Sequence, residues 1–532
     1  MGRRFLIGLL ILPLIIGSAP LGAATAASSA DVRHLPSSDT AVGPVLIRIE
    51  DDGNRPPKPT VLDFQNTALL DLVRLTTPQG YRLKTRFLEP RVPLVQSLAF
   101  SVDPQLRERL IEAARWSNTP RARGEGLLGI ASERNIAHLK YFKEALLDQD
   151  INIQFAAVEA LQVWARPEAK EYLADAARRA WTPIIQIFAA QALLRLGDGR
   201  GRQFLLDGLQ APDWLTRAMA ARYLGDLGEA QDADLLLSRI GVERDNDFVL
   251  AEVCIASLKL LAKKAPPPPP PVVVPSRARP APAPRNPFEL EPLIVTAPRL
   301  NLPQNLVDPR IDNDLVRLLE QLATQPTPEE QVLSAYDEQL NRLTTPTGFA
   351  LKIRYSDLSV LLTEGLAGTK NYTLISRLEE IARTSVNARI RSSAVVALGY
   401  EPDRKEYSVF QNALQDPNIL VRFSAVEALS VMEDDGARAL IAGAAQSDAS
   451  KAIQAFSAQK LCSLGDPYGR QLLFRFLDDQ DWTLRAMAVY GLGEWGEADD
   501  YYTILSRFNN ETADFVQTEM ALALLKMSKR FP

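Results

Sequence analysis

The chain has 532 residues, of which 46% are hydrophobic and 23% are charged, and its formal net charge is -5. This length and composition are typical of a globular protein with two or more domains. A mildly acidic chain lacks the basic surface that a phosphate backbone requires, so we expect no nucleic acid among its partners.

The first 26 residues have the order of a targeting segment. Arg3 and Arg4 precede an apolar stretch from 5 to 16, and a short run of small residues follows. That order is typical of a signal peptide that is cleaved after export. The apolar stretch is too short to cross a membrane. We therefore expect a signal peptide over 1–26, a periplasmic or extracellular protein, and no membrane span after cleavage.

The next segment, residues 27–62, is polar and carries several prolines. It contains one short apolar run, Pro44–Ile47. This composition predicts an extended arm that could include a short strand.

A short segment with alternating side chains occurs twice, as residues 80–87 and 348–355, each time after Leu-Thr-Thr-Pro. In the first copy, Tyr81, Leu83 and Phe87 alternate with basic residues, which predicts a half-buried strand. Its basic edge could bind a partner, or the strand could cap the open end of a helical stack. We favour the cap because helical arrays require one. The candidate partner-binding residues of these two segments are Lys84, Arg86, Lys352 and Arg354.

Short predicted helices with a period of about 32 residues fill most of the remaining chain, a period typical of helical solenoids. More polar helices are expected between the apolar ones, and the scheme repeats from Tyr372 to Met527. The apolar, inner helices of the first copy are predicted at Arg123–Ala131, Ile151–Trp164, Ile184–Leu196, Trp214–Leu227 and Phe248–Leu261.

The helical part of the chain is duplicated. Residues 196–239 align without a gap to residues 464–507, with roughly half of the letters identical. The sequence therefore predicts an all-α protein with two α-solenoid domains, 63–262 and 329–532. A proline-rich linker, 263–328, is expected to join them.

The start of one repeat resembles a HEAT repeat. Asp416-Pro417-Asn418 is followed by Arg422 and by Ala425-Val426-Glu427-Ala428-Leu429, a pattern similar to the short bacterial variety called the PBS-lyase HEAT-like repeat. The resemblance implies an α-solenoid of the armadillo type that binds other proteins. Glutamine replaces the arginine of the pattern in three repeats, at Gln154, Gln186 and Gln454.

Two repeats begin with Asp-Trp followed by an arginine, at Trp214 with Arg217 and at Trp482 with Arg485. Tryptophan and arginine are frequent anchors in protein interfaces, so these four residues are candidate partner-binding residues. Alternatively, the arginines link adjacent repeats and the tryptophans cover the edge of the core. We favour this structural interpretation because the repeat pattern itself uses aspartate and arginine at these positions.

The linker carries an unbroken proline run, Pro266–Pro271, which predicts an extended spacer, with a docking site for a proline-reading domain as the alternative. Further along, Leu293, Ile294 and Val295 lie in a stretch similar to the TonB box of outer-membrane receptors. That resemblance implies strand addition to a partner, whereas the alternative is plain linker. Helices are expected at Ile311–Ala323 and Glu329–Leu343.

The chain has few histidines and cysteines, two residue types that are common in catalytic and metal-binding sites. The only histidines are His34 and His138, too few for a multi-histidine metal site or for a base in each copy. The two cysteines, Cys254 and Cys462, occupy non-equivalent positions in helical runs, which favours two buried thiols. We expect no catalytic, cofactor-binding or metal-binding residues.

These observations predict an exported, non-catalytic protein-binding scaffold or adaptor of the bacterial envelope. The alternative is a lyase- or chaperone-like protein that acts on a bound prosthetic group, which the resemblance to phycobilin lyases implies. Deoxyhypusine hydroxylase also uses HEAT repeats but holds iron with His-Glu pairs. No His-Glu dipeptide occurs here, so we exclude that activity.

Overall fold

The computed structural model describes residues 42, 43, 46, 67–88, 91–117, 119–180, 182–264, 309–324, 338–369, 371–401 and 406–531. Every regular element in these ranges is a helix, which confirms the all-α prediction. The predicted signal peptide, the proline run and the TonB-like stretch at Leu293, Ile294 and Val295 lie outside the described residues.

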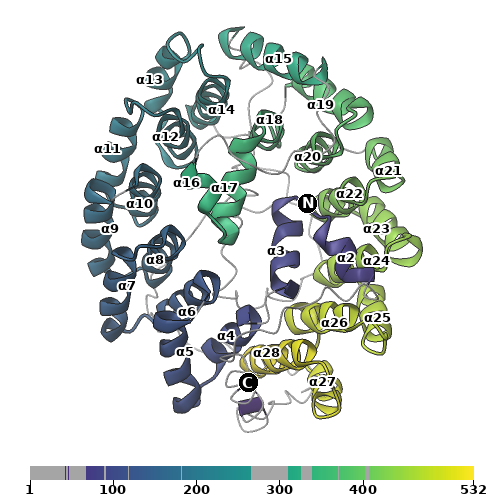
Figure 1. Cartoon of the computed structure of the whole chain (residues 1–532). Coiled ribbons are helices and arrows are strands. Elements are labelled where there is room, and N and C mark those ends of the chain that lie inside the picture. Colours follow the sequence, from purple (N-terminus) through teal and green to yellow (C-terminus); the bar gives the residue numbers. More distant parts are fainter. Residues whose placement is uncertain are drawn as a thin grey trace, which may run out of the picture.

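The first copy is an arc of alternating outer and inner helices (Figure 1). The five inner helices predicted within it are confirmed, with ends within a few residues of those expected, and so are the more polar helices between them. A short 3-10 turn, Ile136–His138, precedes α7. The outer helices are α5 (Pro104–Trp116), α7 (Leu139–Leu146), α9 (Pro167–Arg179), α11 (Gly199–Gly208) and α13 (Asp232–Arg239). The inner helices are α4 (Arg91–Phe100), α6 (Pro120–Ser132), α8 (Ile151–Trp164), α10 (Pro183–Arg195), α12 (Trp214–Leu227) and α14 (Asp247–Lys264).

The second copy repeats this arrangement, and the helix predicted at Ile311–Ala323 is confirmed as α15 (Pro309–Thr324). The helix predicted at Glu329–Leu343 lies in part outside the described residues, and its described part contains the short helix α16 (Glu338–Arg342). The outer helices are α19 (Tyr372–Thr384), α21 (Ser408–Leu414), α23 (Asp435–Ser447), α25 (Pro467–Phe476) and α27 (Asp500–Phe508). The inner helices are α18 (Leu358–Gly365), α20 (Ala388–Gly399), α22 (Ile419–Met432), α24 (Lys451–Ser463), α26 (Trp482–Trp495) and α28 (Asp514–Arg530).

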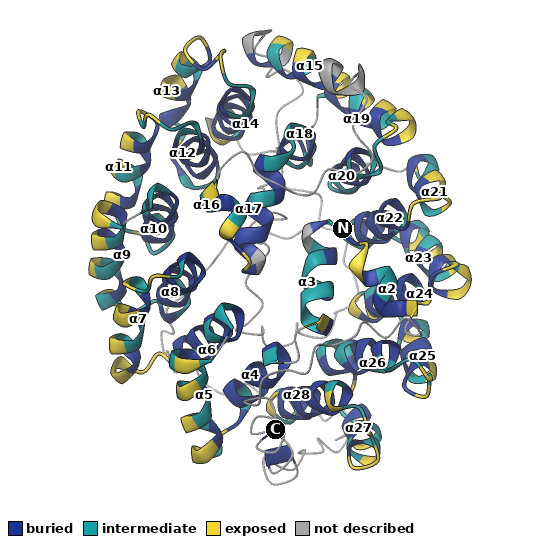
Figure 2. Cartoon of the chain, in the orientation of Figure 1, coloured by how far each residue is buried: buried dark blue, intermediate teal, exposed yellow. Residues whose placement is uncertain are grey.

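Local sequence explains why the helices start and pack where they do. Most inner helices begin at an Asp, Asn, Ser or Thr side chain that accepts a hydrogen bond from the first turn, as Asp213 does for α12. Small residues then let neighbouring inner helices approach closely. A Cβ atom added at Gly225 would lie 2.7 Å from the Cα atom of Ala256. The inner helices are therefore buried on most sides, whereas the outer helices expose one face (Figure 2).

The two arcs close on each other into a ring (Figure 1). At one end α28 packs against α4, and at the other α14 packs against α15 and α18. The last inner helix of each copy thus contacts the first inner helix of the other. Buried apolar residues of both copies form one continuous cluster, so the two solenoids share a core. This closure could not be read from the sequence.

Four helices lie inside the ring (Figure 1). They are α2 (Thr67–Val73), α3 (Pro78–Leu88), α16 (Glu338–Arg342) and α17 (Pro346–Ser356). Helix α2, from the first copy, packs against α24 and α26 of the second, whereas α16, from the second copy, packs against α8 of the first. Helices α3 and α17 pack against each other. Each copy therefore places its N-terminal segment on the inner face of the other.

The predicted strands at 80–87 and 348–355 are wrong, because these residues form α3 and α17. A threonine caps each helix: Thr77 Oγ1 accepts from Gly80 N and Thr345 Oγ1 accepts from Gly348 N, both at 3.1 Å. Helix α17 is buried on several sides, so its apolar residues fit a strand and a helix equally well. Of the short strand considered at Pro44–Ile47, only Leu46 is among the described residues, and it is helical.

Candidate functional site inside the ring

A buried arginine from α17 joins the two copies at one end of the ring. Arg354 Nε donates to Glu252 Oε1 at 2.6 Å, and Arg354 Nη2 donates to Glu252 Oε2 at 3.0 Å. Tyr355 Oη donates to Glu252 Oε1 at 3.0 Å. Burial alone would lower the pKa of Arg354, but the charge of Glu252 and its hydrogen bonds raise that pKa above its ordinary value. The guanidinium is therefore charged and bound to the carboxylate of Glu252.

Its counterpart in α3 closes the other end of the ring. Arg86 Nη2 donates to Glu519 Oε2 of α28 at 2.7 Å, and Arg86 Nη1 donates to Gln96 Oε1 at 2.9 Å. The Arg86 guanidinium also lies 4.6 Å from the centroid of the Tyr490 ring. Arg86 and Arg354, which we considered as partner-binding residues, are thus buried and bonded within the chain. The ion pair of each arginine joins one copy to the other, so both arginines help to hold the ring closed.

The two candidate lysines flank an aromatic pair at the contact between α3 and α17. Tyr81 and Phe349 stack with ring centroids 3.3 Å apart. Lys84 Nζ lies 5.3 Å from the Tyr81 centroid, and Lys352 Nζ lies 5.9 Å from the Phe349 centroid. Burial lowers the pKa of both lysines. Because both remain partly exposed, their partner-binding role stays a prediction.

The candidate arginine of α12 links neighbouring repeats. Arg217 Nε donates to Glu243 Oε2 at 3.1 Å, and Arg217 Nη1 donates to the carbonyl oxygens of Ala211 and Pro212, each at 2.9 Å. The adjacent Trp214 is half-buried, with its ring centroid 5.4 Å from that of Phe248.

The corresponding pair in α26 has the same arrangement. Arg485 donates to both carboxylate oxygens of Glu511 at 2.9 Å and to the carbonyl oxygen of Asp479 at 2.8 Å. The Trp482 ring stacks on Phe515 at 4.7 Å. These contacts agree with the structural interpretation of the arginines, whereas partner binding by either tryptophan stays a prediction.

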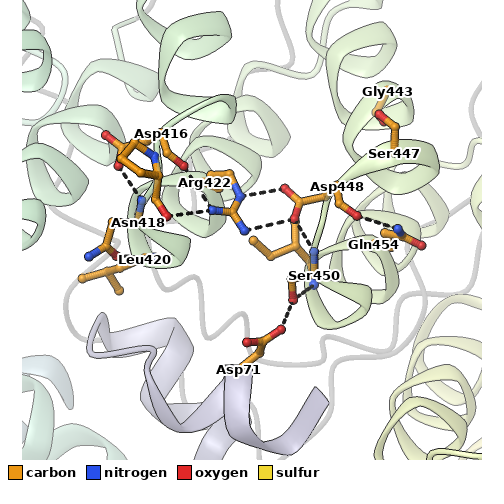
Figure 3. Close-up of polar contacts among 12 residues, drawn as sticks. Asp71, Asp416, Asn418, Leu420, Arg422, Gly443, Ser447, Asp448, Ser450 and Gln454 are labelled. Atoms are coloured by element: carbon orange, nitrogen blue, oxygen red, sulfur yellow. Dashed lines mark hydrogen bonds and ion pairs between the residues drawn. The ribbon is translucent and has the colours of Figure 1, made fainter. Parts of the chain in front are cut away.

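Arginines and glutamines together form a ladder along the inner helices. Arg422 Nη1 donates to the carbonyl oxygen of Asp416, six residues earlier, at 3.1 Å, and its Nε donates to Asp448 at 3.0 Å (Figure 3). Gln454 donates to the carbonyl oxygen of Asp448 at 2.6 Å, again six residues earlier. Gln154 and Gln186 do the same. The glutamines therefore keep the main-chain contact and give up the ion pair, which the sequence did not reveal.

Helix α2 is held on the second copy by two side chains at the starts of inner helices. Ser450 Oγ, at the start of α24, donates to Asp71 Oδ2 of α2 at 2.5 Å (Figure 3). Asp481, at the start of α26, accepts from the main-chain nitrogen of Ala68 at 3.2 Å. We call Ser450 and Asp481 the α2 seat. Nothing in the sequence distinguished these two residues from ordinary helix caps.

A side-chain amide holds the corresponding segment on the first copy. Asn152 Nδ2, in the first turn of α8, donates to the carbonyl oxygen of Arg342 at 3.1 Å. The main-chain nitrogen of Thr344 donates to Asn152 Oδ1 at 2.7 Å. One carboxamide thus binds both a main-chain donor and a main-chain acceptor, a contact that does not depend on the bound side chains.

Two equivalent glutamates are buried on the inner helices, Glu159 on α8 and Glu427 on α22. Burial raises the pKa of each carboxyl to about 7. Each has one carboxylate oxygen with no hydrogen-bond partner. The charged or polar groups that act on them are Thr347, Glu125 and Arg82 for Glu159, and Lys460, Glu364 and Arg82 for Glu427.

The two cysteines and His138 are buried among the helices. Cys254 and Cys462 are buried thiols, as predicted. His138 is buried with Nδ1 3.0 Å from the carbonyl oxygen of Ile130. Within the described ranges, no three His, Cys, Asp or Glu side chains gather as a metal ion would require. Over the same ranges, no helix is long and apolar enough to span a bilayer.

A model of one protein family matches nearly the same region of each copy. Residues 171–259, from α9 to α14, and residues 437–525, from α23 to α28, fit the family model of HEAT repeats. Both segments are HEAT repeats. The match confirms HEAT repeats in both solenoids, whereas the PBS-lyase HEAT-like type stays a prediction.

Comparison with other proteins adds little to the HEAT-repeat assignment. A solved structure of human deoxyhypusine hydroxylase in complex with glycerol is 16% identical and covers 69% of this chain and 97% of its own, with a TM-score of 0.24. At that TM-score the similarity supports no argument about this chain. A search of the curated proteins found no match.

Proposed function

We propose that this chain is an exported, non-catalytic scaffold of the bacterial envelope that binds a protein partner on the inner faces of its HEAT repeats. The observation that carries the proposal is the pair of hydrogen bonds between the Asn152 carboxamide and the main chain, in which Asn152 donates to Arg342 and accepts from Thr344. Inner helices that bind a main-chain segment of their own chain in this way can bind a segment of another protein by contacts of the same kind elsewhere on the inner faces.

The α2 seat supports the same conclusion. Asp481 accepts from a main-chain amide at the start of α2, and Ser450 donates to an acidic side chain of that helix. Both inner faces therefore hold peptide segments through polar groups at the starts of inner helices. Export rests on the order of basic, apolar and small residues in 1–26. The short bacterial type of HEAT repeat is part of this proposal.

Affinity capture tests the proposal. The mature chain would be immobilised and exposed to an envelope extract of its own source cells, and retained proteins would be identified by mass spectrometry. A scaffold should retain one or two proteins in stoichiometric amounts. Absence of a retained protein, together with a coloured or covalently modified product, would contradict the scaffold and favour the lyase-like alternative.

A further inference from the structure

Two large apolar side chains stand at neighbouring ends of outer helices on the first solenoid. Trp116 is the last residue of α5 and is 68% exposed, and Leu147 directly follows α7 and is 78% exposed. Arg115 connects the two helices, with its guanidinium 4.7 Å from the centroid of the Trp116 ring and 5.2 Å from that of Tyr141 in α7. Both helices expose their outer faces (Figure 2). The two apolar side chains therefore lie where another molecule can reach them.

The fold does not require these two apolar side chains. In the second solenoid, α19 and α21 take the places of α5 and α7, and the residues equivalent to Trp116 and Leu147 are Thr384 and Gln415. An apolar side chain that packing required would be apolar in both copies. Exposed tryptophan and leucine in one copy alone point to an interface with another molecule.

The exposed faces of α5 and α7 carry opposite charges. One and two helical turns before their apolar ends, α5 carries Glu112 and Glu108, whereas α7 carries Lys143 and Lys140. Among the described residues, Glu108 and the two lysines form no ion pair, and Glu112 pairs only with Arg109 of its own helix, at 3.8 Å. The counterparts of both lysines in the second solenoid are uncharged. These charges are therefore available to a partner.

The arrangement of charge indicates what kind of surface fits here. A partner with a single sign of charge, an anionic lipid surface included, would meet like charges on one of the two helices. Arg115 of α5 and Glu144 of α7 pair with each other at 3.5 Å and leave this balance unchanged. A complementary surface is basic opposite α5 and acidic opposite α7. The chain itself carries such a surface, because its α7 is basic and its α5 is acidic.

We infer that two copies of this chain associate through α5 and α7 about a two-fold axis. Consecutive outer helices run in the same direction, because an inner helix returns the chain between them. An axis between the two helices and parallel to them therefore sets α5 of each chain against α7 of the other at equal height. Trp116 then contacts Leu147 of the second copy, and Glu112 pairs with Lys143 of the second copy. This interface lies outside the ring and is additional to the proposed function.

Sedimentation equilibrium of the mature full-length chain tests the inference. We expect monomers and dimers in equilibrium at chain concentrations of about 1–100 µM, as for other small interfaces. The substitutions W116T and L147Q together introduce the residues of the second solenoid. They should weaken dimerisation by about tenfold or more, the effect of losing a tryptophan anchor. The matched control is V386S, which removes a side chain of the second solenoid that is 78% exposed and should leave dimerisation unchanged.

Charge reversal tests the two-fold pairing itself. E112K alone sets two lysines against each other, and K143E alone sets two glutamates against each other, so each should weaken the dimer. The two substitutions in one chain restore opposite charges across the axis and should restore dimerisation. Melting temperatures equal to that of the wild type would show that all variants are folded.

A wild-type chain that stays monomeric over the whole concentration range would overturn the inference. Dimerisation that W116T with L147Q leaves unchanged would overturn it as well, and a dimer that E112K with K143E fails to restore would contradict the two-fold pairing. None of these results depends on the capture experiment. If the chain is monomeric but captures a protein, the scaffold stands and the dimer interface is wrong.

Discussion

Arg354 of α17 and Glu252 of α14 form a buried two-point ion pair, with N–O distances of 2.6 and 3.0 Å, that joins the second copy to the first. Arg86 of α3 and Glu519 of α28 form the corresponding pair in the opposite direction. The duplication has therefore produced a reciprocal closure, in which each copy supplies an arginine to one junction and a glutamate to the other. Because these junctions close the ring, the inner faces that we propose as binding faces point into its interior (Figure 1).

Loss of the arginine at one junction should destabilise the whole chain. The substitution R354M leaves Glu252 buried without a counter-charge, so we expect the free energy of unfolding to fall by about 3–5 kcal/mol. Denaturant titration followed by circular dichroism would measure this change. The matched control is R377A, which removes an exposed pair with Glu380 and should cost less than about 1 kcal/mol. A cost for R354M no larger than that of R377A would show that the junction does not stabilise the fold.

The buried glutamates predict a loss of stability as pH rises. The pKa of Glu159 and of Glu427 in the folded chain is about 7, above the ordinary value of 4.5. The folded state therefore holds these protons more tightly than the unfolded state. The contribution of these two carboxyls to stability is fully present below pH 4.5, falls between pH 4.5 and 7, and is smaller by about 3 kcal/mol per carboxyl above that range.

Glutamine variants isolate this effect from the other carboxyl groups of the chain. E159Q and E427Q remove the titrating proton, so their stability relative to wild type should increase from pH 5 to pH 8. Measurement of unfolding free energies at both pH values gives the difference. An identical pH dependence of the wild type and the double variant would contradict buried, protonated carboxyls at these positions.

The ladder of arginines and glutamines predicts a graded response at Arg422. R422Q should keep the hydrogen bond to the carbonyl oxygen of Asp416, as Gln454 does with Asp448, and lose only the ion pair with Asp448. We expect R422Q to cost about 1 kcal/mol and R422A about 2 kcal/mol in the free energy of unfolding. Equal costs for the two variants would mean that the main-chain contact contributes nothing.

The stack of Tyr81 on Phe349 should couple α3 to α17. The substitutions Y81A and F349A and their combination form a double-mutant cycle, and we expect a coupling free energy of about 1 kcal/mol in stability. The variant Y81F separates the ring from its hydroxyl, which donates to the carbonyl oxygen of Thr344 at 3.2 Å. Additive effects of Y81A and F349A would indicate that the rings do not interact in solution.

The repeat units could be predicted from the sequence because their signals are local. Ile151–Trp164 and Trp214–Leu227 begin one residue after an aspartate cap, and both helices have these bounds in the structure. Helix α17 was not predicted, because contacts on several sides of a short helix remove the clean periodicity that distinguishes it from a strand. Helix α3 buries Leu83 and Phe87 on one helical face, but Tyr81, Leu83 and Phe87 also fit the alternation of a strand, which led to the wrong prediction.

The candidate site was predicted only in part, because its contacts join distant segments. The basic residues of both short segments were predicted as candidates for partner binding. Nothing in the sequence indicated that Glu252 and Glu519 would form ion pairs with Arg354 and Arg86. The α2 seat joins Asp71 to Ser450 across most of the chain. Such contacts follow from ring closure and not from any local pattern.

Each copy closes the ring on the other, and cutting the chain between the copies tests this closure most directly. A protease site placed within residues 265–308 would be cleaved in the folded protein, and the products would be analysed by size-exclusion chromatography with light scattering. We predict that both pieces remain together as one species with the mass of the intact chain, and that R86M with R354M causes them to separate. Separation of the wild-type pieces on cleavage would contradict the ring.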